Sequence, residues 1–520
     1  MKKIEVIGTF SFLSATFAPM LQPETLAYRI AQAFIHHPTS SQQQAIDVFT
    51  RFMCSPSSMA VMILRGSAGT GKTSLAAAFV KALSLLGIRQ MLLAPTGRAA
   101  KVFALYAGHT AYTIHRIIYR QKQAATFSAF TLAPNKASNT LFIVDESSMI
   151  SNDGHADALF GQGRLLDDLV QYVYSGNNCR LLLIGDSAQL PPVEQEQSPA
   201  LQRHVLEEYG MDVFETTLSE VLRQSLQSGI LANATAIRQL VEHDELTALP
   251  RITFKSFADI SIVRGNELVE TLANSYVRVG QDETVVVTRS NKRANIYNQG
   301  IRAQVLDCEE EISSGDMLMV VKNNYYWAAA EGVEANSTAQ KLAFIANGDR
   351  VRVSRVRNHR SFYGLKFVDL TLVFPDYDDR QINCTAILDT LTTEAPALTA
   401  EQQQMLYNGV MEDYAYIPLK RDRIEKIKND IYYNALQIKF GYAVTCHKAQ
   451  GGQWEHVYVD QGYMTAEMLT SSYLHWLYTA FTRATGHLYL VNWSEQQTNG
   501  DGAASWRKRK TEIISENAVY

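Results

Sequence analysis

The stretch GSAGTGKT, from Gly66 to Thr73, limits what this 520-residue chain can fold into more than any other feature. It fits the pattern GxxxxGK[ST], and it lies between an apolar run at 59–65 and an Ala- and Leu-rich stretch at 74–86. A buried strand, a glycine-rich loop and a helix in this order form a phosphate-binding loop, because backbone N–H groups and the helix N-terminus surround an anion. We expect Lys72 to reach the β- and γ-phosphates of ATP and Thr73 to bind Mg²⁺. The predicted nucleotide-binding residues are Gly66, Ser67, Ala68, Gly69, Thr70, Gly71, Lys72 and Thr73.

Further apolar runs fit buried strands of a parallel sheet, and those at 141–146 and 181–186 end in acidic residues. Apolar runs also lie at 91–94, 284–290, 455–460 and 487–491, with helix-favouring stretches between most of them. This alternation predicts an α/β fold whose parallel sheets are covered by helices on both faces. Residues from about 305 to 435 contain β-segments and long polar stretches instead. We therefore expect two α/β domains, the second interrupted by a largely β insertion, and a smaller insertion at about 116–138 in the first.

Asp145 and Glu146 follow directly after the apolar run LFIV at 141–144. Ligands of parallel sheets gather at the carboxyl ends of strands, where this pair is expected to lie. Asp145 would bind Mg²⁺ through water, and Glu146 would orient or deprotonate an attacking water. An acidic pair at a strand end is usually only a solvated terminus, but behind a phosphate-binding loop the catalytic interpretation is favoured.

The composition excludes several classes of protein. With 48 Lys+Arg against 52 Asp+Glu and 46% hydrophobic residues, the chain is an ordinary globular protein of net charge −4, which argues against coating nucleic acid by bulk charge. The five cysteines include no CxxC pair, which fits a reducing compartment. No apolar run is long enough to cross a bilayer, and an ordinary N-terminal extension is favoured over a signal peptide. We expect a cytoplasmic protein.

Nine short motifs occur in an order that resembles one family, the superfamily-one helicases of the RecD/Dda type. They are TSSQQQA (39–45), GSAGTGKT (66–73), APTGRAAK (94–101), YTIH (112–115), VDESSM (144–149), GDSAQLPPV (185–193), LSEVLRQ (218–224), TCHKAQGGQW (445–454) and YTAFTRA (478–484). The resemblance implies two RecA-like P-loop motor domains, with a β-hairpin-type insertion in the first and an SH3-like β insertion in the second. The expected boundaries are an N-terminal extension at 1–38, the first motor domain at 39–217, the second at 218–304 and 436–495, the SH3-like insertion at 305–435 and a C-terminal tail at 496–520.

The resemblance also implies roles for single residues. Gln42 matches a glutamine that reads adenine, and Gln189 matches one that senses the γ-phosphate. Arg223 and Arg483 match two arginine fingers of the second motor domain, whose planar cations neutralise charge on the transferred phosphoryl group. The implied DNA contacts are Thr96, Thr113, His115, Thr445, His447 and Lys448.

Two features leave alternatives open. The insertion at about 116–138 occupies the position of a strand-separating pin, where Phe127 and Phe130 are either wedge residues or the small core of a hairpin. The strand-like segment DRVRVSRVR places Arg350 and Arg352 on one face, which is either a DNA-facing surface or an ordinary solvated one. Stacking platforms for bases, if present, would come from Phe103, Tyr112 and Tyr119.

The sequence thus predicts an ATP hydrolase that moves 5′ to 3′ on single-stranded DNA, unwinds duplex and acts at junctions, with no membrane partner and activity as a monomer. Polarity comes from the resemblance alone. A non-catalytic subunit of a DNA-processing complex and a P-loop phosphotransferase are the alternatives. Repair, recombination and other pathways are not distinguished by any residue.

Overall fold

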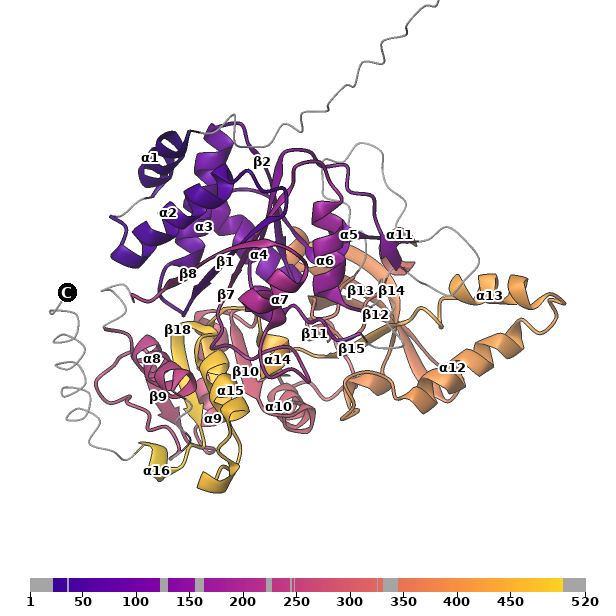
Figure 1. The fold of residues 1–520 in the computed structure, drawn as a ribbon. Coiled ribbons are helices and arrows are strands. Elements are labelled where there is room, and N and C mark those ends of the chain that lie inside the picture. The colour runs from indigo at the N-terminus through magenta and orange to yellow at the C-terminus, as the bar shows by residue number, and fades with distance from the viewer. Residues whose placement is uncertain are drawn as a thin grey trace, which may run out of the picture.

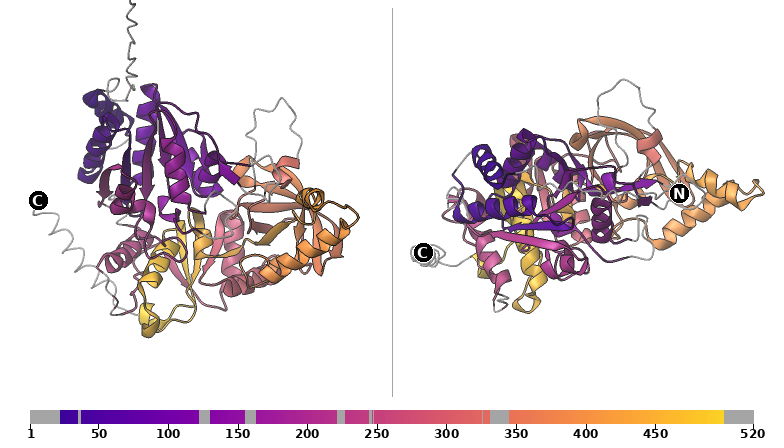
Figure 2. Two further views of the ribbon diagram at one scale, coloured as in Figure 1. Left: turned by 45° about the vertical axis from the view of Figure 1, so that its right-hand side comes forward. Right: turned by 45° about the horizontal axis from the view of Figure 1, so that its top comes forward.

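The computed structural model describes residues 22–34, 37–121, 130–154, 163–220, 227–243, 246, 248–324, 326–330 and 345–498. Two open sheets and one small barrel organise this part of the chain. Figure 1 shows the first sheet with its helices above the second, and Figure 2 shows the barrel beside both.

The first sheet is parallel throughout and has the strand order β3-β2-β6-β7-β1-β8. In β1, Val61 and Ile63 pack into the core on one face, while Met62 and Leu64 pack into the core on the other, because successive side chains of a strand alternate. Because β1, β6 and β7 run parallel, the segments that follow them all begin at the carboxyl edge of the sheet. The strand bounds are β1 Ala60–Gly66, β2 Arg89–Ala94, β3 Ala111–Thr113, β6 Thr140–Val144, β7 Arg180–Gly185 and β8 Asp212–Leu218.

Helices cover both faces of this sheet. On one face lie α1 Pro23–Ala33, α2 Ser40–Cys54, α3 Lys72–Leu85 and α4 Gly97–Ala107, and on the other α5 Ile114–Ile118, α6 Leu165–Tyr174 and α7 Arg203–Glu208. The rings of Phe49 in α2 and Phe79 in α3 stack with centroids 3.9 Å apart. Thr39 begins α2 with a capping box, which satisfies two backbone donors and fixes where this helix starts.

The second sheet is also parallel, in the order β16-β10-β17-β18-β9. Its strands are β9 Ile260–Val263, β10 Thr284–Thr288, β16 Ala443–Thr445, β17 Trp454–Asp460 and β18 Ala484–Val491. One face packs on α8 Gly229–Glu242, α14 Cys446–Ala449 and α15 Ser471–Phe481, and the other on α9 Leu268–Arg278 and α10 Asn291–Gln304. The short α16 Glu495–Thr498 ends the described chain.

Five strands close into a barrel between the two parts of the second α/β unit. They are β11 Met317–Val320, β12 Arg350–Phe362, β13 Leu365–Phe374, β14 Arg380–Ile387 and β15 Leu436–Phe440. The expected boundary after residue 435 is wrong for this element, because β15 pairs with β11 and β14 and so closes the barrel. The barrel interior and one face of the second sheet share a single hydrophobic core, which includes Leu318 and Val286.

The described part of the barrel region also contains three α-helices. A small β-hairpin belongs to the first α/β unit. The helices are α11 Tyr326–Ala330, α12 Ala400–Asp413 and α13 Lys420–Lys428, of which α12 and α13 project away from the barrel (Figure 1). The hairpin pairs β4 Tyr119–Gln121 with β5 Phe130–Leu132 and lies within the expected insertion at 116–138.

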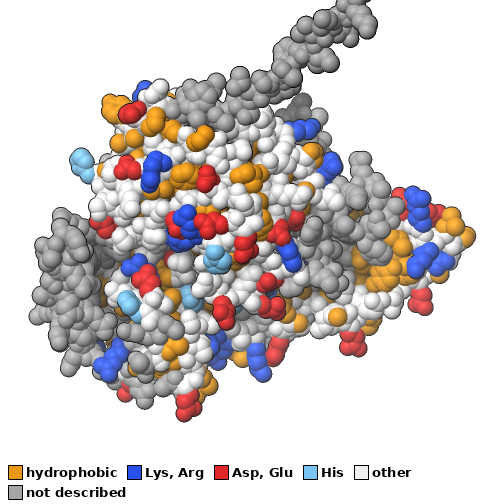
Figure 3. Space-filling model, viewed as in Figure 1, with side chains coloured by type: hydrophobic (Ala, Val, Ile, Leu, Met, Phe, Trp, Pro, Cys, Tyr) orange, Lys and Arg blue, Asp and Glu red, His pale blue; other side chains and the backbone are white. Residues whose placement is uncertain are grey.

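The surface has no single-signed field on the face drawn in Figure 3, where basic and acidic side chains are interspersed. This pattern agrees with the near-balanced charge of the sequence. Among the described helices, none combines the length and the apolar character that a bilayer-spanning segment requires.

Candidate functional site

The glycine-rich loop joins β1 to α3 at the carboxyl edge of the first sheet. Gly69 and Gly71 have φ angles of 80° and 83°, in the left-handed region that residues with a Cβ disfavour. A Cβ on Gly66 would stand 2.7 Å from Thr70 Oγ1, so a side chain has no room there. These positions explain why glycine occupies them: the backbone curls tightly just before the helix begins.

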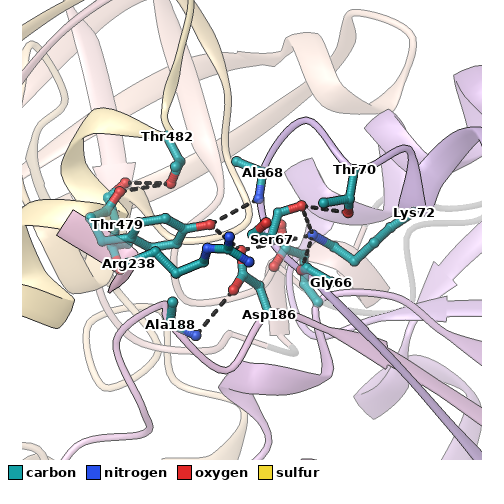
Figure 4. Close-up of polar contacts among 12 residues, drawn as sticks. Gly66, Ser67, Ala68, Thr70, Lys72, Asp186, Ala188, Arg238, Thr479 and Thr482 are labelled. Atoms are coloured by element: carbon teal, nitrogen blue, oxygen red, sulfur yellow. Dashed lines mark hydrogen bonds and ion pairs between the residues drawn. The ribbon is translucent and has the colours of Figure 1, made fainter. Parts of the chain in front are cut away.

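The Lys72 ammonium lies inside this loop. Its Nζ donates to the carbonyl oxygens of Gly66 at 2.6 Å and Ser67 at 3.0 Å, and it lies 3.8 Å from Asp186 Oδ2 (Figure 4). Ser67 Oγ and Gln189 Oε1 are buried and have no hydrogen-bond partner among the described residues. A cation wrapped in backbone, with orphaned polar atoms at the same sheet edge, fits a polyanion such as a triphosphate chain.

Asp145 and Glu146 stand at the end of β6, on the same edge. Desolvation, together with the charge of Glu146, raises the pKa of Asp145 to about 7, while the Glu146 backbone N–H and Lys72 act to lower it. Asp145 Oδ1 accepts that N–H at 2.9 Å. The influence of Lys72 places both groups within electrostatic reach, as a shared cation and phosphate site requires. In the described ranges there is no cluster of three or more His, Cys, Asp or Glu side chains that could hold a metal ion.

Gln42 is 1% exposed and already engaged. Its Oε1 accepts the Thr39 backbone N–H at 3.0 Å, and its Nε2 donates to the Thr70 carbonyl oxygen at 3.0 Å. The carboxamide therefore ties the start of α2 to the glycine-rich loop. Its role in reading adenine stays a prediction.

The loop after β7 reaches across to the second α/β unit. The Leu190 backbone N–H donates to Thr479 Oγ1 at 2.7 Å, and Gln450 Nε2 donates to the Leu190 carbonyl oxygen at 2.6 Å. The Ala188 carbonyl oxygen lies 2.9 Å from His475 Nδ1. This loop contains Gln189, which is thereby held at the boundary between the two units.

Tyr478 of α15 is a site residue that the sequence reasoning missed. Its hydroxyl accepts the Ala68 backbone N–H at 2.8 Å and donates to Asp186 Oδ2 at 2.6 Å, so one phenol from the second unit binds two groups of the first. Burial and the Asp186 charge raise the pKa of Tyr478 well above its usual range. The available signal was a tyrosine opening the motif YTAFTRA on an otherwise apolar, buried helix.

The two predicted arginine fingers have different outcomes. Arg223 lies outside the described residues. Arg483 is 2% exposed, and its guanidinium donates to the carbonyl oxygens of Thr479 at 3.0 Å and Gly452 at 3.1 Å and to Thr482 Oγ1 at 3.2 Å. All three acceptors belong to its own unit, so the described contacts do not bring Arg483 to the glycine-rich loop.

The predicted DNA contacts cluster in part at the boundary between the units. Thr96 caps α4, with its Oγ1 accepting the Ala99 N–H at 3.2 Å, and a Cβ on Gly451 of the TCHKAQGG motif would stand 3.0 Å from that oxygen. The structure thus brings the APTG and TCHKAQGG motifs together. Thr113 is 7% exposed and precedes α5, while Thr445 is partly buried and precedes α14.

The two histidines and the aromatic candidates are less uniform. Burial lowers the pKa of His115 to about 4, so this ring is neutral at pH 7. Desolvation also lowers the pKa of His447, although part of its side chain is exposed. Phe103 is fully buried in the core and is wrong as a stacking platform, and Tyr119 is 8% exposed. Tyr112 stays partly exposed, with Arg116 5.0 Å over its ring.

Lys448 and Lys439 lie close together. The sequence predicted Lys448 as a DNA contact but did not single out Lys439. Lys448 Nζ is buried without a hydrogen-bond partner among the described residues, and Lys439, on β15, is 6% exposed and donates to the Thr393 carbonyl oxygen. Burial lowers the pKa of each to about 8, and Lys439 lowers that of Lys448 further. Two adjacent buried cations favour an anion such as a phosphodiester.

Two other expectations fall elsewhere. Phe127 and the Phe130 side chain lie outside the described residues, so the pin is not assigned to them. The DNA-facing alternative for β12 is wrong for Arg350, which is 5% exposed and donates to the carbonyl oxygens of Asp282 and Gly441. Arg352 binds the Asp282 carboxylate.

Two RecA-like parallel units with a glycine-rich phosphate loop at their boundary define a P-loop nucleotide-binding protein. Residues 39–254 match the AAA domain family, and residues 440–491 match the UvrD-like helicase C-terminal domain. Together with the relatives below, these matches support a superfamily-one helicase of the RecD/Dda type.

Several curated relatives share parts of the sequence. The ATP-dependent RecD2 DNA helicase of Deinococcus radiodurans is 34% identical over 134 residues, 26% of this chain and 16% of that protein. The ATP-dependent DNA helicase dda of phage T4 is 26% identical over 271 residues, 49% of this chain and 55% of that protein. This chain therefore spans less than two thirds of either relative. The uncharacterized protein R530 of Acanthamoeba polyphaga mimivirus is 23% identical over 493 residues, 82% of this chain and 94% of that protein.

Solved structures of Pif1 helicases are similar at low identity. The Bacteroides protein in complex with ADP-AlF3 and single-stranded DNA gives a TM-score of 0.44 at 14% identity, covering 92% of this chain and 98% of that one. The Candida albicans protein gives 0.38 at 16% identity, covering 91% and 99%.

Proposed function

We propose that this chain is an ATP-dependent DNA helicase that moves 5′ to 3′ along single-stranded DNA and unwinds duplex at junctions. One observation carries the proposal. The glycine-rich loop of the first unit is hydrogen-bonded to a helix of the second, through Ala68 and Tyr478. A nucleotide bound at this loop would therefore change the position of one α/β unit relative to the other. A motor needs such a change, and a simple phosphotransferase does not.

The residues present suit ATP with Mg²⁺. Lys72 would leave the carbonyl oxygens that it now binds and hold the β- and γ-phosphates, while Thr73 and Asp145 would hold the cation. When bound, Mg²⁺ would neutralise the charge that develops on the transferred phosphoryl group. Glu146 would orient the attacking water, and Gln189, whose Oε1 lacks a partner among described residues, would sense the γ-phosphate.

Movement would follow from alternating grip on the DNA. Closure is favoured only while the terminal phosphate offers contacts to both units, so hydrolysis removes that preference and the boundary reopens. Thr96 of the first unit lies against Gly451 of the second across the boundary, and Thr445 immediately precedes α14 of the second unit. Together with His115, His447 and Lys448 they would hold phosphates without reading sequence, as a motor on arbitrary DNA requires.

The proposal is tested by ATP turnover of the full chain with and without single-stranded DNA, using Lys72→Ala as the inactive control. We expect DNA to stimulate turnover severalfold or more. Turnover that depends on a small acceptor would indicate a phosphotransferase, and no turnover would indicate a non-catalytic subunit.

Polarity and oligomeric state need separate measurements. Forked substrates that carry a 5′ or a 3′ single-stranded tail distinguish the two directions, and we expect unwinding from the 5′ tail. Preference for the 3′ tail would overturn the assigned direction. Light scattering during turnover tests the proposal that a monomer is active.

A further inference from the structure

An arginine outside the family motifs lies beside the glycine-rich loop. Arg238 belongs to α8, which packs with α15 on one face of the second sheet. Figure 4 shows its side chain extending toward Asp186 and the Ser67–Ala68 segment. Its positive charge also lies close enough to act on the Tyr478 phenol, whose pKa burial raises and the Arg238 charge acts to lower. Arg238 comes from the second unit, whereas Asp186, Ser67 and Ala68 belong to the first.

The guanidinium of Arg238 is poorly satisfied where it lies. Its side chain is 15% exposed, and its Nε is buried with no hydrogen-bond partner among the described residues. Within the described part of the chain it forms one ion pair, from Nη1 to Glu242 at 3.5 Å, and the Glu242 side chain is 53% exposed. Such an exposed pair contributes little to stability, whereas a buried donor without an acceptor is destabilising. An acceptor that arrives with the nucleotide would remove this cost.

The surroundings favour a negatively charged acceptor. Asp186 already shares its carboxylate between Tyr478 and Lys72. When Lys72 turns to a phosphate chain, one cation leaves this cluster while several negative oxygens enter it. Arg483, the motif arginine, is meanwhile held by three acceptors of its own unit. Unlike Arg483, Arg238 faces the glycine-rich loop from the second unit, and its buried Nε has no acceptor among the described residues.

We propose that Arg238 is a catalytic residue of the ATPase reaction, reaching across the boundary to the terminal phosphate of the nucleotide. The inference rests on the proposed function and adds a residue to it. Five N–H donors in a planar fork match the oxygens of a phosphoryl group, and their charge would count most as negative charge spreads in the transition state. Since the contact joins the two units, it would also favour closure only while that phosphate is present.

The test compares Arg238→Gln with Glu242→Gln, which removes the surface ion pair on the same helix but leaves the guanidinium. Arginine fingers contribute about 10³–10⁵ in kcat; for one of several cations here, we expect Arg238→Gln to lower DNA-stimulated kcat at least about 100-fold. The KM for ATP should change less than about threefold, and Glu242→Gln should keep near wild-type turnover.

A second readout does not depend on turnover. Wild-type protein should bind ADP with aluminium fluoride and Mg²⁺ more tightly than ADP alone, and Arg238→Gln should lose that preference while it binds ADP normally. Equal losses in Arg238→Gln and Glu242→Gln, or a retained preference for the fluoride complex, would overturn the role of Arg238. A wild-type protein without ATPase activity would overturn the proposed function instead. Unchanged melting of both variants shows that the fold is intact.

Discussion

The Tyr478 hydroxyl donates to Asp186 Oδ2 at 2.6 Å, joining residues 292 positions apart in the sequence and in different α/β units. The same carboxylate oxygen lies 3.8 Å from Lys72 Nζ. Asp186 therefore lies between the lysine of the glycine-rich loop and the second unit. If Lys72 moves to a bound nucleotide, as proposed above, the phenol would remain as a donor to this buried carboxylate.

Tyr478→Phe removes one oxygen and should weaken the coupling between the glycine-rich loop and the second unit. A hydrogen bond to a charged group contributes about 1.5–3 kcal/mol, so we expect DNA-stimulated kcat to fall about 10- to 100-fold with nucleotide affinity little changed. The matched control is Tyr473→Phe in the same helix, because the Tyr473 hydroxyl donates to Gln461 inside the second unit. Similar losses in both variants would show that Tyr478 acts only through packing or local stability.

Asp145→Asn should stabilise the fold in a pH-dependent way. The folded-state pKa of about 7 exceeds the usual value of 3.8, so the folded protein holds this proton more tightly and loses stability as pH rises between these values. The asparagine carries no such charge. At pH 8 we expect a higher Tm than wild type, with a free energy of unfolding larger by on the order of 1 kcal/mol or more, and both differences should shrink toward pH 5. A gap that stays constant with pH would contradict the buried-charge explanation.

Lys439→Gln should weaken binding of single-stranded DNA and lower the slope of log affinity against log salt by about 1. Both lysine pKa values are lowered to about 8, so their charge is present below that pH and lost above it. Wild-type affinity should therefore fall between pH 7 and pH 9, whereas in the variant Lys448 lacks its like-charged neighbour and the fall should move to higher pH. Lys426→Gln, on the exposed face of α13, is the control. Anisotropy titrations measure each case, and an unaltered salt slope in Lys439→Gln would exclude a phosphate contact.

Gly451→Ala should hold the two units apart. At φ 72° a Cβ is strained, and here it would also stand 3.0 Å from Thr96 Oγ1 and 3.1 Å from Ala99 Cβ of the first unit. We expect DNA-stimulated turnover to fall severalfold. Gly462→Ala is matched in backbone, with φ 71°, but has nothing within 4 Å of its Cβ, so it reports the strain alone, about 1 kcal/mol. If both alanines reduce turnover alike, contact with Thr96 plays no part.

The sequence predicted those parts of the site that lie within one stretch of chain. A phosphate-binding loop consists of consecutive residues, so the sequence alone predicts the loop from Gly66 to Lys72 and the strand before it. Tyr478 and Arg238 could not be predicted, since their significance depends on which loop of the other unit they meet. A contact between distant segments produces no periodic pattern within either segment, so the sequence alone does not reveal it.

The barrel shows the same limit. The expected boundary after residue 435 puts Leu436–Phe440 in the motor domain, and only the pairing of this strand with β11 reveals that it belongs to the barrel. Arg350 was equally ambiguous, because an alternating strand shows which residues share a face and not what covers that face. Here the Asp282 and Gly441 carbonyl oxygens cover it.

The shared core of the barrel and the second sheet has a mechanical consequence. Since Leu318 of the barrel and Val286 of the sheet pack in one cluster, the barrel is expected to turn with the second unit as one lever. Among the contacts of the first unit with the barrel is Lys101 of α4, whose Nζ donates to the Pro375 carbonyl oxygen at 2.6 Å and pairs with Asp376 at 3.5 Å. A small rotation near the glycine-rich loop would be magnified toward the outer ends of α12 and α13, which project furthest from the barrel.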